Sequence, residues 1–527
     1  MKTMKFRLIL KILMIVVMTG VFLSCEKEKV VKRPNILFIM GDDHTSQAIS
    51  AYGTIFGDLF STPNIDRLAN EGMLFNNVYC TNAICGPSRA TIITGKYSHV
   101  NGYYKNESGG QFNDTHWTFI QSLKEHGYQT SLFGKWHLGS EPVGFDYFKY
   151  HNNSNQQGTY YDPVYNENGE NVKEKGYATT LTGDFILDWL EQGREKDKPF
   201  AALLHFKAPH RPWIPEEKYK DLFKGIEMPY PDSFDDAYTG RELTAGDTWM
   251  TIDYFNRVDM KLTPPKELEG KELKEWETHG NHKDEAWLPE GCKTQEEARK
   301  WKYQRYIKDY LACIKTVDDN VGRVLDYLDA NGLTENTIVV YTGDQGFYLG
   351  EHGWFDKRLM YEESSKMPFI VRYPKKVAPK TQNNDMITNA DFAPTLLDFA
   401  NVDVPKAVQG RSFATNLQGE TAADWPKSYY YQYYEYPLWH HVQPHYGVRN
   451  ERYKLIHFYY NIDVWEFYDL EKDPSEMNNR IADPKYKEII QEMKLDIVKH
   501  QDNLEVDTSL KSMRAMTDAN LGLVGGH

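Results

Sequence analysis

The sequence predicts an α/β protein with a large sheet between layers of helices. Short apolar runs at residues 35–40, 130–134, 200–206 and 337–342 each end in a polar cluster, and segments with helical spacing lie between them. Runs this short and this apolar are typical of strands that are covered on both faces. Strands that alternate with helices predict a doubly wound sandwich, in which ligands bind at the carboxyl ends of the strands. The polar clusters therefore predict one site along that edge.

Helices account for most of the remaining pattern in the first part of the chain. Apolar residues three and four apart predict helices over residues 65–75, 117–126, 181–190 and 303–331. Residues 234–296 are polar and rich in Trp and Gly, which is typical of a long insertion that forms a wall or lid. Together these features predict one main domain over residues 34–425.

The pattern changes near residue 426. Antiparallel strands joined by polar turns are predicted over residues 428–436, 446–449, 453–460 and 464–470, and a helix over residues 484–502. We therefore expect a smaller C-terminal α/β subdomain with an antiparallel sheet over residues 426–505. Residues 506–527 show neither helical nor strand spacing, and we expect an irregular tail.

The N-terminus predicts export. Basic residues precede the apolar stretch 12–23, which is too short for a comfortable membrane span and stops at Cys25 in a loose lipobox. We expect residues 1–25 to be a lipoprotein signal peptide, Cys25 to carry the lipid anchor, and residues 26–33 to be a tether. The protein would then be exported and anchored in the outer membrane, on the cell surface or the periplasmic face. The alternative is an ordinary cleaved signal peptide.

Charge and cysteine content restrict the class of protein. The net charge of -14 argues against nucleic-acid binding, and it means that an anionic substrate needs a local basic pocket. Besides Cys25 and Cys85, the chain has only Cys80, Cys292 and Cys313. An odd number cannot pair completely within the chain, so we expect no disulfide framework.

Two polar pairs at predicted strand ends indicate a metal site. Asp42 and Asp43 follow one strand, and Asp344 and Gln345 follow another. Adjacent carboxylates repel each other and need a cation if they converge. Their hard oxygen atoms suit Ca²⁺ better than Zn²⁺, with Mg²⁺ as an alternative. A solvated turn or helix cap is the other interpretation of the Asp pair, and His44 beside it either lines the pocket or supports it from behind.

Residues 85–89, with the sequence CGPSR, followed by Thr94-Gly95, resemble the signature of the sulfatase family. The resemblance implies that Cys85 is oxidised to Cα-formylglycine by a formylglycine-generating or anaerobic sulfatase-maturating enzyme. The hydrate of that aldehyde offers one hydroxyl that attacks sulfur and a second whose deprotonation expels sulfate. Without the family context, Cys85 would be interpreted as a small buried hydrophobic residue.

Further motifs extend the resemblance over most of the chain, and they imply an alkaline-phosphatase-like fold. The motif GKWHLG, residues 134–139, implies that Lys135 holds sulfate oxygens and that His137 is the base that triggers sulfate release. In the same way His210 would protonate the leaving alcohol; Lys207 is a weaker candidate. Lys357 and Arg89 would neutralise charge on the sulfuryl group. The implied metal ligands are Asp42, Asp43, Cys85, Asp344 and Gln345, where Gln345 replaces the commoner Asn.

The residues around Lys357 indicate a substrate. The run Asp356-Lys357-Arg358, followed by MYEES at residues 360–364, is similar to family members that act on glucosamine 6-sulfates. Asp356 and Arg358 could clasp sugar hydroxyls, or could simply form a local ion pair. His440, His441 and His445 are further candidates for sugar contacts, and we expect His445 to bind the substrate.

The sequence thus predicts a calcium-dependent sulfatase that acts on a sulfated glycan, with 6-O-sulfated N-acetylglucosamine in heparan-type or mucin-type glycans as the expected substrate. A phosphate or phosphonate monoester hydrolase of the same superfamily is the nearest alternative enzyme. A catalytically inactive, glycan-binding surface lipoprotein is the alternative from another class.

Overall fold

The structure is a computed structural model that describes residues 33–106, 112–153, 156–280, 285–437 and 440–518. The chain divides into residues 1–33 and residues 34–527, and the second unit is described below. The predicted signal peptide, Cys25 and all of the tether except Arg33 lie outside the described residues. No helix in the described part combines the length and the apolar character needed to cross a membrane.

A ten-stranded mixed sheet forms the centre of this unit. Its middle strands run parallel in the order β9 (Thr337–Gly343), β1 (Asn35–Gly41), β8 (Phe200–Phe206), β4 (Gln129–Gly134) and β5 (Tyr147–His151). All residues of β1, β8 and β9 are buried, which explains their apolar sequences. The edges are completed by β11 (Phe369–Arg372), β2 (Met73–Phe75), β12 (Thr381–Asn383), β6 (Val164–Glu167) and β7 (Glu170–Lys173).

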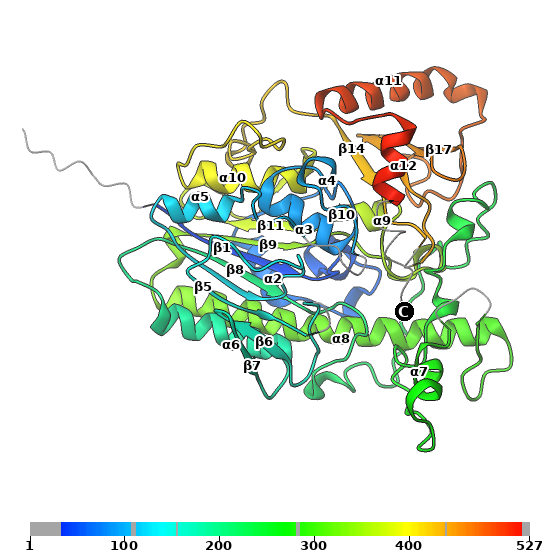
Figure 1. The fold of residues 1–527 in the computed structure, drawn as a ribbon, viewed down its shortest axis with the longest axis horizontal. Coiled ribbons are helices and arrows are strands. Elements are labelled where there is room, and N and C mark those ends of the chain that lie inside the picture. Colours follow the sequence, from blue (N-terminus) through cyan, green and yellow to red (C-terminus); the bar gives the residue numbers. More distant parts are fainter. Residues whose placement is uncertain (1–32, 107–111, 154–155, 281–284, 438–439, 519–527) are drawn as a thin grey trace, which may run out of the picture. The chain divides into compact units, whose positions relative to one another are not determined.

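Helices cover both faces of the sheet (Figure 1). One layer contains α2 (Pro63–Asn70), α6 (Ala178–Asp188) and α8 (Gln295–Ala330), and the other contains α3 (Cys85–Thr94), α5 (Phe119–Glu125) and α10 (Phe392–Phe399). Side chains of β1 alternate between the layers: Phe38 packs in one hydrophobic core, and Leu37 and Ile39 pack in the other. The predicted α/β sandwich is confirmed.

Smaller elements complete the main domain. A three-stranded sheet contains β10 (Lys366–Met367), β3 (Val78–Tyr79) and β13 (Ile387–Thr388). Short helices are α4 (Ser98–Asn101) and α9 (Glu362–Ser365). The predicted insertion at residues 234–296 contains mostly turns and α7 (Gly270–Thr278). It leads into α8, whose Thr294 cap accepts a hydrogen bond from the Glu297 backbone.

The C-terminal region forms a four-stranded antiparallel sheet of β14 (Ser428–Tyr433), β15 (His445–Asn450), β16 (Tyr453–Phe458) and β17 (Val464–Asp469). On one face Tyr430 packs against α11 (Lys487–Asn503), and on the other Tyr429 and Tyr431 join the core of the main domain. This alternation buries both faces and fixes the sheet against the main domain.

Two sequence predictions were wrong. Residues 65–75 form α2 and then β2, because the chain turns at Gly72 to pair Met73 and Leu74 with β11. A Cβ atom on Gly72 would lie 2.1 Å from the Val371 carbonyl oxygen. The tail contains α12 (Leu510–Asp518), which tertiary contacts hold: the Lys105 Nζ donates to the Thr517 carbonyl at 2.5 Å.

Candidate active site

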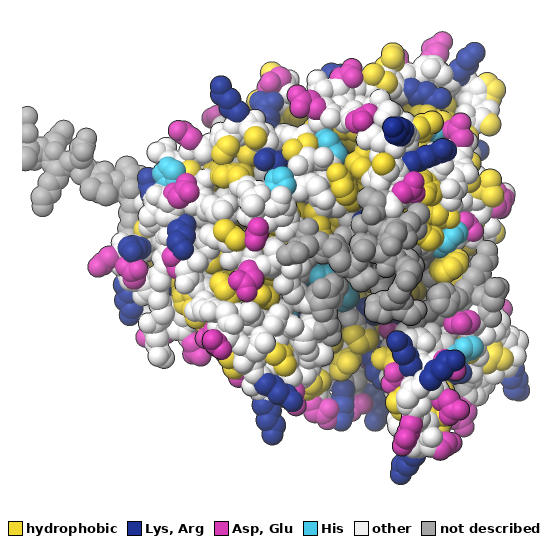
Figure 2. All heavy atoms as spheres, viewed as in Figure 1, with side chains coloured by type: hydrophobic (Ala, Val, Ile, Leu, Met, Phe, Trp, Pro, Cys, Tyr) yellow, Lys and Arg dark blue, Asp and Glu magenta, His cyan; other side chains and the backbone are white. Residues whose placement is uncertain are grey.

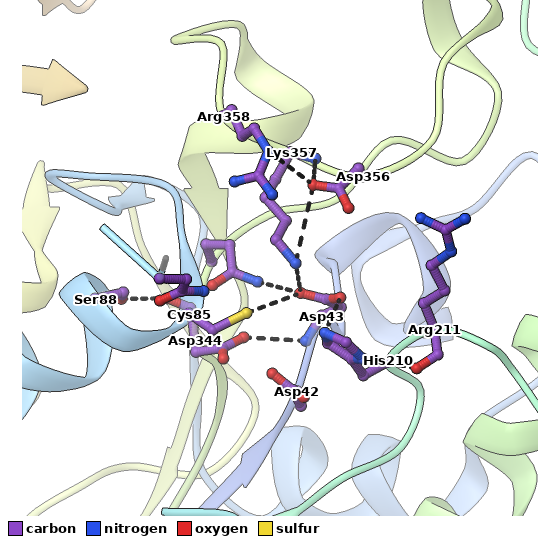
Figure 3. Close-up of polar contacts among 12 residues, drawn as sticks. Asp42, Asp43, Cys85, Ser88, His210, Arg211, Asp344, Asp356, Lys357 and Arg358 are labelled. Atoms are coloured by element: carbon purple, nitrogen blue, oxygen red, sulfur yellow. Dashed lines mark hydrogen bonds and ion pairs between the residues drawn. The ribbon is translucent and has the colours of Figure 1, made fainter. Parts of the chain in front are cut away.

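The candidate site lies at the carboxyl ends of the parallel strands β9, β1, β8 and β4, which are neighbours in the sheet. Asp344 and Gln345 follow β9, Asp42 and Asp43 follow β1, and His210 lies beyond β8. Lys135 and His137 follow β4, and Cys85 begins α3. Figure 3 shows Asp42, Asp43, Cys85, His210, Asp344 and Lys357 pointing into one space. The polar clusters predicted from the sequence therefore converge.

Cys85 is a buried thiol in the middle of this cluster. Its side chain is 1% exposed, and Sγ lies 3.8 Å from Oδ1 of Asp43. The next residue, Gly86, donates its backbone N–H to Oδ1 of Asn106 at 3.0 Å, and a Cβ atom there would lie 2.4 Å from the Tyr103 ring. Burial raises the pKa of the Cys85 thiol well above its usual value, so the unmodified side chain is a poor nucleophile.

Arg89 lies one helical turn after Cys85, and its side chain contacts residues at the ends of three strands. Its Nε donates to Oδ2 of Asp344 at 3.0 Å, its Nη1 donates to the Lys135 carbonyl at 2.9 Å, and its Nη2 lies 3.4 Å from Oδ1 of Asp42. Such a fork of donors fixes several acceptors at once. The Arg89 side chain thus fixes the positions of Asp344, Lys135 and Asp42 relative to one another.

Three carboxylates face three cations in this interior. Asp42 pairs with Lys135, Asp43 lies 2.7 Å from Nζ of Lys357, and Asp344 pairs with Arg89. Burial raises the pKa of Asp43 to about 6, against the opposing effect of Lys357. Burial and the neighbouring Asp42 raise the pKa of Asp344 to about 7. Charges are costly to bury unless they are paired, so these pairings are needed for the site to exist.

The positive charge that an anionic substrate needs is inside the protein. Arg89, Lys135 and Lys357 are each at most 2% exposed. On the face shown in Figure 2, basic and acidic side chains are interspersed, without a broad basic area among the coloured atoms. A negatively charged group would therefore be recognised by the buried cluster and not by a general surface field.

The donor set fits a divalent cation. Ligand atoms of Asp42, Cys85 and Asp344 all lie within 4.8 Å of one another. The Nε2 of Gln345 donates to Oδ1 of Asp43 at 2.5 Å, while its buried Oε1 has no hydrogen-bond partner among the described residues. Carboxylate and amide oxygens of this kind are ligands for hard cations. The structure thus brings together all five residues predicted as ligands, and the unpartnered amide oxygen is free to join them.

Two histidines follow the neighbouring strands β4 and β8. Nε2 of His137 lies 2.8 Å from the carboxamide nitrogen of Gln157, and Nε2 of His210 lies 3.8 Å from Oδ2 of Asp43. Burial, reinforced by the charge of Lys135, lowers the pKa of both imidazoles well below the usual value. Both rings are therefore neutral near pH 7 and able to accept a proton.

Two other candidates, His44 and Lys207, are also buried beside the site. Nδ1 of His44 lies 2.5 Å from the Tyr341 hydroxyl and Nε2 lies 3.4 Å from the Ala48 carbonyl, so the fully buried ring faces the core. Nζ of Lys207 lies 5.2 Å from the centre of the Tyr160 ring, and burial lowers its pKa to about 8. Of the two interpretations offered for His44, the structure favours the supporting one.

Asp356 and Arg358 form a second polar group on the outer side of Lys357. Oδ1 of Asp356 lies 3.4 Å from Nε of Arg358, and Oδ2 lies 3.2 Å from Nε2 of His440. Arg358 also contacts Glu435 at 3.1 Å. Asp356 and Arg358 have φ angles of 75° and 98°, which a non-glycine residue adopts only where its surroundings enforce it. In Figure 3 Lys357 points toward Asp43, and Oδ1 of Asp356 lies between Arg358 and Nζ of Lys357, 4.0 Å from the latter.

We expected His445 to bind the substrate, but it does not join the group formed by Asp356 and Arg358. Its Nε2 accepts the backbone N–H of Met360 at 3.1 Å, and its Nδ1 lies 2.8 Å from the Gln443 carbonyl. The ring is fully buried between Tyr431 and Tyr433. Both nitrogens are thus engaged by the backbone, and His445 supports the loop that carries Arg358. Of the histidines considered, His440 is the one in contact with Asp356.

Two residues near the site were missed from the sequence. Glu435 contacts Arg358 and also accepts the Asn106 backbone N–H at 2.8 Å. Gln157 contacts His137 from a loop between β5 and β6. Neither residue belongs to a recognisable motif, and only a strand-end position marks Glu435, so spacing alone could not identify them.

Comparisons with known proteins define the class. Residues 34–402 match the sulfatase family model, and residues 350–503 match the C-terminal region of N-sulphoglucosamine sulphohydrolase. The chain belongs to the sulfatase family and is a sulfuric ester hydrolase. Family membership implies a formylglycine at the position of Cys85 and a divalent metal, consistent with the donor set described above.

The chain is also similar to individual proteins of known activity or structure. The chain is 46% identical to an N-acetylglucosamine-6-O-sulfatase of Bacteroides thetaiotaomicron, over 90% of this chain and 88% of that protein. It is 26% identical to human N-acetylglucosamine-6-sulfatase, over 75% and 66% of the two chains. A sulfatase structure solved with its substrate D-glucosamine-2-N,6-O-disulfate superposes with a TM-score of 0.83 at 44% identity, covering 90% and 99% of the chains. A phosphonate monoester hydrolase of Agrobacterium radiobacter shares the fold at 20% identity, with a TM-score of 0.67 over 90% and 96% of the chains.

Proposed function

We propose that this sulfatase removes the 6-O-sulfate from N-acetylglucosamine or N-sulfated glucosamine units of heparan-type or mucin-type glycans. Two of the comparisons support this substrate, because one relative is named for it and one similar structure was solved with a 6-O-sulfated glucosamine. The proposal also needs a feature of this chain that can recognise a sugar beside the sulfate.

The group formed by Asp356, Arg358, His440 and Glu435 is that feature, and it is the observation that carries the proposal. Lys357 points toward Asp43, beside which the sulfuryl group would bind, while its two neighbours offer an acceptor and a donor next to it. Asp356, which is 7% exposed, keeps its charge, since Lys357 and Arg358 hold its pKa well below the usual range despite burial. A paired carboxylate and guanidinium suit adjacent hydroxyls, as on a sugar ring.

We propose Ca²⁺ as the metal, held by Asp42, Asp43, Asp344, the Oε1 of Gln345 and an oxygen at position 85. Oxygen donors without a histidine favour Ca²⁺ over Zn²⁺. Three carboxylates are already balanced by Arg89, Lys135 and Lys357. A bound divalent cation therefore gives the site a net positive charge, which an anionic sulfate ester would offset. Mg²⁺ is the alternative that the same oxygen atoms allow.

The chemistry proposed at residue 85 is the one that membership of the sulfatase family implies. Formylglycine would supply a hydrated aldehyde, with one hydroxyl to attack sulfur and a second to release sulfate. Lys357 and Arg89 would stabilise the charge on the transferred group, and Lys135 would hold one of its oxygens. Neutral His137 would accept the proton of the second hydroxyl. His210 would deliver a proton to the leaving alcohol once a bound anion favours its protonated form.

The N-terminal predictions complete the proposal. A lipid anchor on Cys25 would place the enzyme at the outer membrane, where it meets glycans or their imported fragments. The supporting observations are the basic residues, the apolar stretch 12–23 and the lipobox that ends at Cys25. Labelling with a radioactive fatty acid, lost in a Cys25→Ala variant, would test this part.

A panel of sulfated saccharides tests the substrate. Matured protein is incubated with N-acetylglucosamine 6-sulfate, glucosamine-2-N,6-O-disulfate, and sugars sulfated only at O2, O3 or O4, and free sulfate is measured. We expect release from the 6-O-sulfated sugars and none from a Cys85→Ala control. Release from a 2-O-sulfated or 4-O-sulfated sugar in preference to both 6-O-sulfates would reject the substrate but leave the sulfatase assignment intact.

A further inference from the structure

The ring of His137 has one hydrogen-bond partner among the residues that the structure describes, and that partner is Gln157. The Gln157 Nε2 lies 2.8 Å from Nε2 of His137. The other ring nitrogen, Nδ1, is buried without a partner, and so is the Oε1 of Gln157. The orientation of this imidazole, and the nitrogen that carries its proton, therefore depend on a single neutral side chain.

Gln156, the residue before Gln157, fixes the backbone that follows His137. Oε1 of Gln156 accepts the backbone N–H groups of Leu138 at 3.2 Å and Gly139 at 3.0 Å, and its Nε2 donates to the Ser140 carbonyl at 3.2 Å. The two consecutive glutamines thus have different contacts: Gln156 binds the backbone after His137, and Gln157 binds the imidazole ring.

The loop that carries these glutamines is itself fixed. Gly158 has a φ angle of 74°, and a Cβ atom there would lie 2.5 Å from the His151 ring. His151 stacks on Tyr165 of β6 with ring centres 4.5 Å apart. The Gly158 backbone N–H donates to the Asn153 carbonyl at 3.0 Å. Since only glycine fits here, Gln157 is held beside His137 by the edge of the main sheet.

We propose that Gln157 is a positioning residue for His137, which it holds in the orientation needed to take a proton from residue 85 and give it up again. The proposal rests on the proposed function, in which His137 is the base for sulfate release. In that step the proton of the second hydroxyl moves to His137 and the O–H electron pair forms the carbonyl. The C–O bond to sulfate breaks, and its electron pair leaves on the sulfate.

A carboxamide suits this task better than a carboxylate. His137 can take the proton on Nδ1 only when its Nε2 carries the ring proton and donates to the Oε1 of Gln157, because a neutral ring whose Nε2 accepts already has its proton on Nδ1. A carboxamide provides that acceptor after turning over, since it presents Oε1 or Nε2 to the same ring nitrogen. It carries no charge, so it leaves in place the low pKa that burial and Lys135 give to His137. A carboxylate at this position would favour the imidazolium and would make His137 a poorer base at neutral pH.

The first test measures the protonation and tautomer of the His137 ring directly and does not require enzyme activity. Gln157→Leu, Gln157→Glu and a control, Asn153→Ala, are prepared with Cys85 unmodified and with isotope-labelled histidine. Asn153 lies in the same loop but donates to Thr159 instead of His137. The His137 signals are assigned by their loss in His137→Asn and followed by NMR against pH.

We expect Gln157→Glu to raise the pKa of His137 by about one unit or more, because a charged neighbour replaces a neutral one. Gln157→Leu should change the proportion of the two neutral tautomers, whereas Asn153→Ala should match the unmodified sequence. Identical His137 signals in all of these proteins would overturn the proposal.

The second test separates positioning from general damage. Matured Gln157→Leu is mixed rapidly with N-acetylglucosamine 6-sulfate, and desulfated sugar is measured over the first turnover and at steady state. A slowed release of sulfate should give a rapid first turnover followed by a steady state about 10–100-fold slower than wild type. Equal losses in both phases would mean that Gln157 has only a structural role. If wild type itself releases no sulfate, the proposed function fails, and the NMR result alone decides the role of Gln157.

Discussion

Nζ of Lys357 lies 2.7 Å from Oδ1 of Asp43, a residue 314 positions away in the chain. The contact joins the loop after β9 to the end of β1, and it directs Lys357 into the catalytic cluster. The neighbouring side chains have other partners as well: Asp356 contacts His440, and Arg358 contacts Glu435. In the proposed function, this one short run of sequence serves two purposes, chemistry at sulfur and contact with the sugar.

This division predicts different losses on different substrates. Asp356→Ala or Arg358→Ala should cost about 2–4 kcal/mol in kcat/KM on a 6-sulfated glucosamine, as for a lost charge-assisted contact. Both variants should lose much less on a small aryl sulfate, which has no sugar hydroxyls. Lys357→Ala should impair both substrates alike. Equal losses of Asp356→Ala on both substrates would show that Asp356 only orders Lys357.

Glu435 should act through Arg358. Its carboxylate contacts Arg358 at 3.1 Å and also accepts the Asn106 backbone N–H. Glu435→Gln keeps the hydrogen-bonding shape but removes the charge, so we expect KM for the 6-sulfated sugar to rise about tenfold with little change in kcat. A fall in kcat at unchanged KM would argue that Glu435 serves the chemistry instead. Steady-state kinetics on the glycan fragment measure both.

Metal removal should abolish activity. Asp42, Asp43 and Asp344 meet in a buried space, and the donor set is rich in oxygen. Chelation followed by gel filtration should leave an inactive protein, and Ca²⁺ should restore it better than Zn²⁺. Elemental analysis should find one calcium per chain. Two zinc ions per chain, with activity restored by zinc, would support a phosphatase-type site.

The buried His445 predicts a pH dependence of stability. Burial lowers its pKa to about 4, from about 6.5 in an unfolded chain. Between these values the unfolded state binds the proton and the folded state does not, so stability falls as the pH falls from about 6.5 to about 4. This group should contribute a slope of up to about 1.4 kcal/mol per pH unit.

His445→Gln cannot take up this proton. The variant should be less stable at neutral pH, because it loses well-placed contacts with the backbone of Met360 and Gln443. Its stability should nevertheless change less steeply between pH 6.5 and 4 than that of wild type. Denaturant titrations at several pH values measure both slopes; parallel slopes would show that His445 is already protonated in the folded protein.

The sequence predicted the parts of this structure that depend on local pattern. Buried parallel strands such as β1 and β9 are apolar throughout, and the polar residues after them must meet at one edge of the sheet. Asp42 and Asp344 could therefore be placed together without a structure. Cys85 and Lys357 were located by their motifs.

The features that were missed depend on tertiary contacts. Met73 belongs to a strand because β11 pairs with it, although its spacing also suits a helix. Helix α12 is held by contacts such as that between Lys105 and Thr517, which leave no periodic signal. The sequence does not distinguish His445 from His440, because both lie in the same histidine-rich stretch. Only the fold shows that the backbone encloses His445 and that His440 contacts Asp356.

The central claim is that Cys85 becomes the formylglycine on which this sulfatase depends. Peptide mass spectrometry of residues around Cys85, on protein produced with a maturating enzyme and assayed in parallel on N-acetylglucosamine 6-sulfate, tests it directly. We predict the mass of the aldehyde at residue 85, with specific activity proportional to the converted fraction. Full activity in protein whose Cys85 is wholly unmodified would contradict the account.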